Sequence, residues 1–219
     1  MHDYHFLAST RLFEGSTPEE IESMLGCLGM HVKKYGVGER IFHMGDKLSE
    51  VGLVLEGQVI IESVDVWGNV SVIGMRGPGM LFGEAYAAVP DEPLMVDVVA
   101  AQKCQIMFLS VPKVLMTCSH ACPNHSRTSN NLTRIIAHQN LSLSRRIFFV
   151  TPKTIRGKVL AYLSDQAERA HSREFDIPFD RQQLANYLGV DRSALSAELS
   201  RMAKDGILET RRNHFVLKE

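Results

Sequence analysis

The chain has 219 residues, of which 45% are hydrophobic and 22% are charged, and its formal net charge at pH 7 is −1. Such a composition is typical of a globular protein with two domains, each large enough to have its own core. No segment approaches the roughly 20 apolar residues of a membrane span, and the N-terminus MHDYHFLAST lacks the basic and apolar regions of a signal peptide. We therefore expect a cytoplasmic protein with no membrane partner.

The N-terminal part of the chain predicts a short helix followed by many short strands. Thr17 is the expected N-cap of the helix, Pro18 its first residue and Glu20 the partner of Thr17 in a capping box. From about Val32 to Leu109, short apolar runs are separated by glycine-containing turns. Regular short strands with such turns predict an antiparallel β-roll rather than a parallel sheet with crossover helices.

Helical periodicity returns after Ser110. We expect a short helix over 112–119 and a long helix that begins near Pro123. In the long helix one stripe recurs at intervals of three and four residues; it consists of Leu132, Ile135, Ile136, Gln139, Leu143 and Ile147. A stripe of this length is typical of a seam between two helices, so it predicts a homodimer. The alternative is that the helix only covers the roll of its own subunit.

The segment from Arg181 to Leu208 predicts two short helices joined by a tight turn. Leu184 and Leu188 mark the buried side of the first helix, and Gly189 ends it. Asp191 is the expected N-cap of the second helix, whose inward residues are Ala194, Leu195, Leu199 and Met202. Two such helices should cross steeply, as in a helix-turn-helix.

A short β-hairpin is predicted after Gly206, with its turn at Arg212 and Asn213, which makes the unit a winged helix. Residues 151–219 contain 12 Lys and Arg against 10 Asp and Glu, whereas residues 1–150 contain 12 against 15. The winged helix is therefore only mildly basic, and its DNA affinity must come from local clusters of arginine and from the presentation of two copies.

The start of the second helix is expected to enter a major groove of DNA. The fork of Arg192 matches the O6/N7 pair of guanine, Ser193 and Ser196 can reach bases or phosphates, and Ala197 can touch a thymine methyl. The start of the first helix should hold phosphate. The full predicted DNA-binding set is Arg181, Gln182, Asp191, Arg192, Ser193, Ser196, Ala197, Arg201, Arg211 and Arg212. The alternative is an ordinary helical hairpin with a solvated polar face.

With this order of elements, with Phe82-Gly83-Glu84 in the roll and with the VDRSALSAEL run of residues 190–199, the chain resembles the CRP/FNR family of bacterial transcription factors. The resemblance implies an α+β fold: an antiparallel β-roll of the cyclic-nucleotide-binding type (a double-stranded β-helix) over 1–122, a dimerisation helix over 123–150 and a winged helix-turn-helix over 151–219. It also implies a homodimer on a palindromic operator, RNA polymerase as a partner, and no enzymatic activity. Because Ser193 and Ala197 stand where the family often has Glu and Arg, we do not expect a TGTGA half-site.

The resemblance places a small-molecule effector at the segment that begins with Phe82. The Glu of the family is present as Glu84, but the Arg and the Ser or Thr that hold a cyclic nucleotide phosphate correspond to Leu94 and Met95. A phosphate would lose its charge-assisted partner there, so we do not expect cyclic AMP. An apolar or aromatic effector fits better; the predicted site is Phe82, Gly83, Glu84, Leu94, Met95 and Val96. The alternative is a loop packed shut without a ligand.

Other sensing chemistries remain as alternatives. No cysteine precedes Cys27, so we expect no iron-sulfur cluster. Haem ligation by His43 or Cys104 is one alternative. Redox or metal chemistry is another, at a cluster formed by Cys118, His120, Cys122 and His125. We nevertheless predict no metal site, and we expect all four cysteines of the chain, including Cys27, to be thiols. A regulatory subunit that binds a ligand and a protein partner without DNA is a third. A cupin-like enzyme is not expected, because the chain lacks an H-x-H pair.

Overall fold

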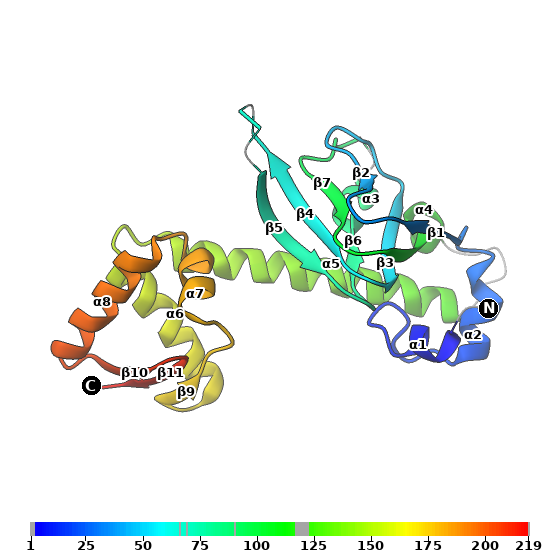
Figure 1. Ribbon diagram of the computed structural model, residues 1–219. Helices are drawn as coiled ribbons and strands as arrows, with labels where there is room; N and C mark the ends of the chain where they lie inside the picture. Colours follow the sequence, from blue (N-terminus) through cyan, green and yellow to red (C-terminus); the bar gives the residue numbers. More distant parts are fainter. Residues whose placement is uncertain (1–2, 66, 69, 90, 117–122, 219) are drawn as a thin grey trace. The chain divides into compact units, whose positions relative to one another are not determined.

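The computed structural model describes residues 3–218, apart from 66, 69, 90 and 117–122 (Figure 1). The chain divides into two compact units, Met1–Ala137 and His138–Glu219. The division falls inside the long helix α5 (Pro123–Val150), which begins where Pro123 predicted it. The expected domain boundaries at 122 and 150 differ from this division, because each half of α5 packs into the unit nearest to it in sequence.

The first unit begins with α1 (Tyr4–Ala8) and α2 (Pro18–Leu25). The predicted capping box of α2 is confirmed: the Glu20 amide donates to Thr17 Oγ1 at 3.3 Å, and the Thr17 amide donates to Glu20 Oε2 at 2.9 Å. A helix of two turns cannot persist alone in water. Its buried face, with Ile21 and Met24 at 0% and 2% exposure, is what holds it on the roll.

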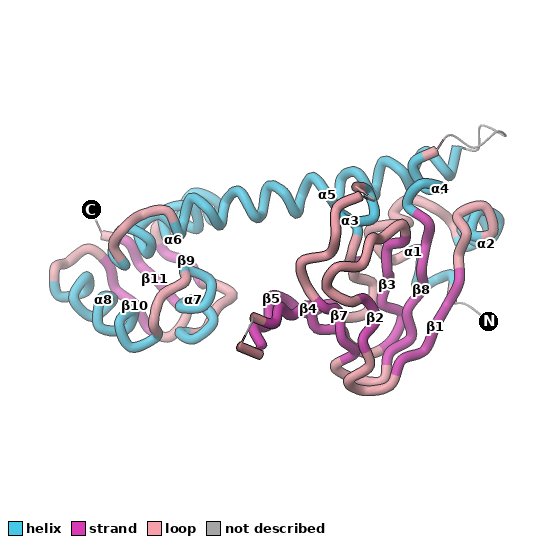
Figure 2. Tube along the Cα trace, turned by 90° about the horizontal axis from the view of Figure 1, so that it is seen from above, coloured by secondary structure: helices cyan, strands magenta, loops and turns pink. Residues whose placement is uncertain are grey.

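The roll consists of two four-stranded sheets, and every pairing among the described strands is antiparallel, as predicted. Figure 2 shows the two sheets gathered into one strand-rich body. The first sheet has the order β1-β8-β3-β6, with β1 (His31–Tyr35), β8 (Cys104–Ser110), β3 (Glu50–Glu56) and β6 (Leu81–Phe82). The second has the order β2-β7-β4-β5, with β2 (Arg40–Phe42), β7 (Asp97–Ala100), β4 (Val59–Val64) and β5 (Val70–Arg76).

Aromatic side chains fill part of the space between the sheets. The ring of Phe42 meets those of Phe82 and Phe108 edge-on, with centroids 5.6 Å and 5.8 Å apart. Gly52 on β3 makes room for them, because a Cβ there would lie 2.2 Å from the Phe82 ring. The roll interior is therefore closely packed at this point.

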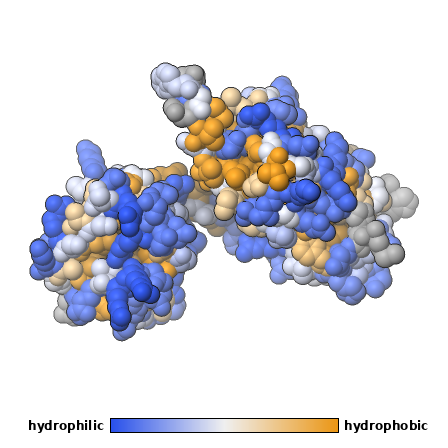
Figure 3. Space-filling view, in the orientation of Figure 1, coloured by the Kyte–Doolittle hydropathy of each residue, from blue (hydrophilic) through white to orange (hydrophobic). Residues whose placement is uncertain are grey.

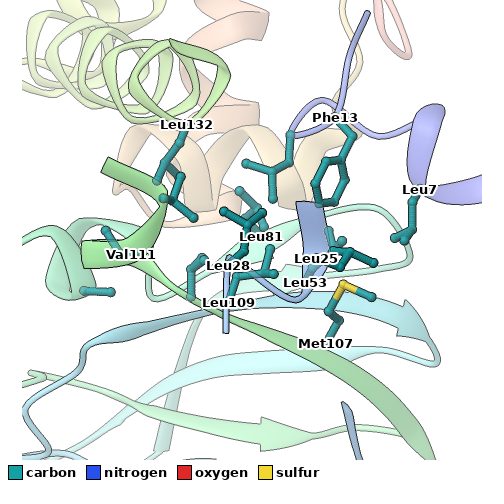
Figure 4. Close-up of a cluster of buried hydrophobic side chains, with 14 of the residues drawn as sticks. Leu7, Phe13, Leu25, Leu28, Leu53, Leu81, Met107, Leu109, Val111 and Leu132 are labelled. Atoms are coloured by element: carbon teal, nitrogen blue, oxygen red, sulfur yellow. The ribbon is translucent and has the colours of Figure 1, made fainter. Parts of the chain in front are cut away.

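A second apolar cluster lies on the other side of the first sheet. Figure 4 shows Leu7 and Phe13 from the N-terminal segment, Met107 and Leu109 from β8, and Leu132 from α5 converging on one core. The short helices α3 (Glu84–Ala88) and α4 (Val111–Leu115) belong to the same unit. Helix α4 ends earlier than the predicted 112–119, and most of the remainder of that range lies outside the described residues.

The first half of α5 packs against the core of its own subunit, and the dimer stripe as a whole stays a prediction. Leu132 is fully buried in the roll cluster, and Ile135 and Ile136 pack against the same cluster. Further along, Leu143 and Ile147 are each 62% exposed. Helical periodicity shows that a face is apolar but not which partner covers it. The predicted stripe therefore includes one part that packs on the roll and another part that is exposed.

Several apolar side chains of β5 remain exposed. Val70, Val72, Ile73 and Met75 are 52–58% exposed, and β5 is the outer strand of its sheet. Figure 3 shows an apolar patch over β4 and β5 on this face of the roll. Among the described residues, no helix combines the length and the apolar composition needed to cross a bilayer.

The second unit is a winged helix, as predicted. After the end of α5 it contains α6 (Ile155–Ala170), β9 (Glu174–Asp176), α7 (Arg181–Leu188), α8 (Arg192–Lys204), β10 (Leu208–Arg211) and β11 (His214–Leu217). The three strands form one antiparallel sheet in the order β10-β11-β9. One apolar cluster joins all of these elements, with Phe149 from α5, Val159 from α6, Leu184 from α7, Leu195 from α8 and Phe215 from β11.

The close approach of Gly52 to Phe82 gives a test of the packing. We expect Gly52→Ala to lower the free energy of unfolding by about 1–3 kcal/mol, because the new methyl group must push the Phe82 ring out of a packed interior. Gly26→Ala is the matched control: a Cβ there meets nothing within 4 Å, and the change should stay within about 0.5 kcal/mol. Urea unfolding measures both, and equal effects of the two substitutions would contradict this account.

Candidate DNA-binding surface and effector site

Local hydrogen bonds fix the two helices of the helix-turn-helix. Asp180 and Gln183 form a capping box at the start of α7, with bonds of 2.7 Å and 2.9 Å. Gly189 ends α7 in the left-handed region, with a φ of 62°. Asp191 then caps α8, and its Oδ1 accepts from the Ala194 amide at 2.9 Å. Hydrogen bonds from the Ser193 hydroxyl and then from the Ala194 amide lower the pKa of Asp191.

Helix α8 divides into a buried and an exposed face, as the sequence predicts. Leu195, Leu199 and Met202 are at most 2% exposed, whereas Arg192, Ser193, Ser196 and Ala197 are exposed. The Arg192 side chain makes no ion pair or hydrogen bond in the described part of the chain, so its guanidinium is available to a ligand. Ser193 differs, because its hydroxyl donates to Asp191 Oδ1 and so belongs to the helix cap.

The wing places two arginines beside α8. Arg211 and Arg212 are exposed at the turn between β10 and β11, and Arg212 has a φ of 56°. A hollow of about 670 Å³ lies between the starts of α7 and α8 and the wing turn; its lining includes Gln182, Arg192, Arg212 and Asn213. Three arginines, Arg181, Arg192 and Arg212, and one carboxylate, Asp180, line the hollow. This excess of positive charge suits an anionic partner such as a phosphate backbone.

Arg181 does not have the expected freedom to hold a phosphate. Its Nη2 donates to Thr210 Oγ1 at 2.7 Å, and its guanidinium lies 5.1 Å from the centre of the Phe215 ring. Burial lowers the pKa of Arg181. The side chain thus joins α7 to the wing sheet. The neighbouring Gln182 is exposed and donates to Asn186 Oδ1 at 2.9 Å.

An ion-pair network that the sequence did not reveal joins α6 to α8. Arg156 Nε lies 2.7 Å from Glu198 Oε1, and Arg156 Nη2 lies 2.6 Å from Asp205 Oδ2. Glu198 also pairs with Arg201, one of the predicted DNA-binding residues, whose side chain is 64% exposed. Glu198 itself is 7% exposed, and the hydrogen bond from Arg156 is the main cause that lowers its pKa. The network therefore ties the middle and the C-terminal end of α8 to α6.

The lowered pKa of Glu198 predicts a pH-dependent stabilisation of the winged helix. Above the ordinary glutamate pKa, about 4.3, the network contributes fully to the free energy of unfolding. This contribution is lost as the pH falls through the lower pKa that Glu198 has in the folded state. We expect Glu198→Gln to lower the midpoint of thermal unfolding at pH 7. The difference in midpoint between variant and wild type should become smaller in acid. Glu209→Gln, which removes an exposed pair with Lys218, should change little. A gap that persists unchanged at pH 3 would contradict this assignment.

The predicted effector segment of the roll contains both buried and exposed side chains. Phe82 and Glu84 are 1% and 4% exposed, and Gly83 precedes α3 with a φ of 78°. Leu94 is buried in the roll core, whereas Met95 is 69% exposed. The two side chains therefore differ sharply in burial, and the effector site at 94–96 stays a prediction. Val96 is partly buried against the same core.

The residues considered for metal, haem or redox chemistry are dispersed or engaged. Among the described residues, no group of three or more His, Cys, Asp or Glu side chains could hold a metal ion. Cys118, His120 and Cys122 lie outside the described residues. His125 is 6% exposed, with Nε2 2.6 Å from the Lys113 carbonyl. The Cys104 thiol donates to the carbonyls of Gln58 and Gln102, and His43 pairs with Asp46 at 3.7 Å.

Sequence comparisons agree with this architecture. A profile of the Crp-like helix-turn-helix domain matches residues 157–219, and a profile of the cyclic nucleotide-binding domain matches residues 32–120. Electron transport regulator A of Shewanella oneidensis is 22% identical over 186 residues, which are 82% of this chain and 72% of that protein. The cyclic AMP receptor protein of Thermus thermophilus is 23% identical over 197 residues, which are 90% of this chain and 87% of that protein.

Solved structures show the same fold. The catabolite activator protein of Thermus thermophilus has a TM-score of 0.51 at 21% identity, and the likeness covers 96% of this chain and 94% of that one. The c-di-GMP responsive global regulator CLP of Xanthomonas campestris has a TM-score of 0.54 at 19% identity, with coverage of 92% and 99%. At this identity the likeness shows the fold alone.

Proposed function

Because the chain belongs to the CRP/FNR family of transcription regulators, we propose that it binds a palindromic operator as a homodimer and regulates transcription in the cytoplasm. The observation that carries this proposal is the exposed start of α8, where Arg192 faces the hollow that it shares with Arg212 of the wing. The relatives are transcription regulators, and we assign no catalytic role to this chain. Contact with RNA polymerase is part of the same proposal.

Each part of the surface has a proposed role on DNA. Arg192 contacts the O6/N7 pair of a guanine, and Ser196 and Ala197 contact the adjacent base edges. Phosphates on either side are contacted by the wing arginines, Arg211 and Arg212, and by the backbone amides at the N-terminus of α7. Arg181 acts indirectly by holding the wing against α7. Ser193 shapes the helix start through Asp191 and has a smaller part in base recognition than its position alone suggested.

Dimerisation is proposed to use the second half of α5. Leu143 and Ile147 are four residues apart on one side of the helix, and both are largely exposed. Leu141 and Phe148 are also exposed but project from a different side, because successive residues are about 100° apart around the axis. Two copies double the number of phosphate contacts, which matters for a winged helix with a small positive charge.

Control by a small molecule is part of the proposal, and cyclic AMP is not the expected effector. The positions that would meet its phosphate carry Leu94 and Met95, and neither side chain can bear a charge or donate a strong hydrogen bond. Glu84 is the one matched polar residue of the segment, and it is buried.

The role of Arg192 can be measured with selected operator DNA. We expect Arg192→Ala to weaken specific binding by about 1–3 kcal/mol, roughly 5- to 150-fold, because the bidentate contact with guanine is lost. Arg11→Ala removes an exposed arginine of the roll and should leave binding unchanged. Gel shifts at several salt concentrations separate specific from non-specific affinity. Equal losses on operator and scrambled DNA would refute base recognition by Arg192, and failure to bind any palindrome would favour a regulatory subunit.

The dimer seam can be tested by one charge. We expect Ile147→Glu to raise the dimer dissociation constant roughly a hundredfold, because two carboxylates would be buried against each other without partners. Leu141→Glu places the same charge on a different side of α5 and should leave the protein dimeric, with an unchanged molecular mass in solution. Sedimentation equilibrium measures both. A protein that remains dimeric with Glu at position 147 would show that the subunits associate through another surface.

A further inference from the structure

Four aromatic rings meet where the end of α5 contacts the winged helix. Phe149 lies edge-on to Tyr162 with centroids 5.5 Å apart, and Tyr162 lies 5.6 Å from Tyr187. Phe179, just before α7, is 4.9 Å from Tyr187 and 6.1 Å from Tyr162. All four belong to the second unit.

A cavity of about 180 Å³ opens between these rings, and its polar lining includes Ser142 and Arg145 from α5 and Asp165 and Arg169 from α6. An apolar protein cavity of about 150 Å³ is large enough to hold benzene. The volume therefore fits one aromatic ring with a short substituent. Offset and edge-on contacts with surrounding rings would stabilise such a ligand beyond the burial of its area.

One hydroxyl of the cavity wall is available to a ligand. The Tyr162 ring is buried, and its hydroxyl makes no hydrogen bond within the described chain. Burial is the main cause that raises its pKa, so the hydroxyl remains a protonated donor at neutral pH. The hydroxyl oxygen is not among the described buried polar atoms without a partner, so it is open to the cavity, where water can reach it. A ligand with an acceptor atom would take the place of that water.

The charges around the cavity favour an anion. Asp165 is already engaged, because Arg169 Nε lies 2.7 Å from its Oδ2 and Gln166 donates to the same oxygen at 3.1 Å. Arg146, next along α5, donates to the Tyr187 carbonyl and lies over the Tyr187 ring. The Arg145 side chain has no ion pair or hydrogen bond in the described part of the chain. One lining cation thus remains without a counter-charge.

We propose that this cavity binds a small aromatic carboxylic acid, with the ring among Phe149, Tyr162, Phe179 and Tyr187 and the carboxylate at Arg145. Arginine is well suited to this role because its fork can hold a carboxylate through two hydrogen bonds. The class of effector agrees with the aromatic ligand expected from the sequence. The site differs, since it lies in the winged-helix unit and not in the roll.

The position of the cavity gives the ligand a route to DNA binding. One wall comes from α5, and the others come from α6 and from the segment that leads into α7. A ligand in contact with all of them stabilises the arrangement of α7 and the end of α5 that it fits best. This coupling rests on the proposed function, whereas the binding step does not.

Calorimetric titration of the full-length protein with phenylacetate tests the binding step directly. We expect saturable millimolar or tighter binding, weakened about tenfold or more in Arg145→Gln. Arg134→Gln removes another exposed arginine of α5 away from the cavity and should bind as the wild type does. Tyr162→Phe keeps the ring and removes the hydroxyl, so it should weaken binding by a smaller factor. Benzyl alcohol and benzylamine are the neutral and cationic comparators, and we expect the carboxylate to bind most tightly.

The outcomes separate this inference from the proposed function. Absence of saturable binding, equal affinity in Arg145→Gln, or tighter binding of benzylamine would overturn the aromatic-acid site while leaving operator recognition intact. Saturable binding that Arg145→Gln weakens would support the site even if no palindrome were ever bound. A shift of operator affinity by phenylacetate in the wild type, absent in Arg145→Gln, would support the coupling to DNA; unchanged affinity would limit the site to binding alone.

Discussion

The burial of one side of α8 is the constraint on which the candidate function depends. Leu195, Leu199 and Met202 share a core with α6, α7 and the wing, so the helix cannot rotate without exposing them to water. Each such side chain contributes about 1.5–3 kcal/mol when it is fully buried. The opposite side, with Arg192 at its start, is consequently fixed outward. The Arg156 network with Glu198 and Asp205 adds a polar restraint on the same rotation.

The surroundings of α8 are organised by less obvious contacts. Arg181 links the start of α7 to the wing through Thr210 and the Phe215 ring, so the hollow between the helices and the wing has a defined shape. The aromatic cluster around Tyr162 plays a comparable part where α5 meets the winged helix. Two sets of contacts thus support the recognition surface: one holds the wing against α7, and the other packs the end of α5 against α6 and α7.

Features that depend on neighbouring residues in sequence were predictable. The capping box of Thr17 and Glu20, the left-handed Gly189, the Asp191 cap and the two-residue wing turn were all predicted from local patterns, since each needs only a few adjacent residues. Features that depend on distant partners were not. The stripe on α5 showed apolar faces but not that Leu132 belongs to its own roll. Nor could spacing show that Leu94 enters the core, or that residues from 142 to 187 enclose one cavity.

The most direct test of the central claim is selection of bound DNA from a random pool, followed by footprinting of the complex. Two copies of α8 in adjacent major grooves should select a palindrome whose half-sites are centred about 10–11 base pairs apart, with protection on one face of the duplex. Enrichment of an asymmetric site with a single protected half, or of no sequence at all, would contradict the account.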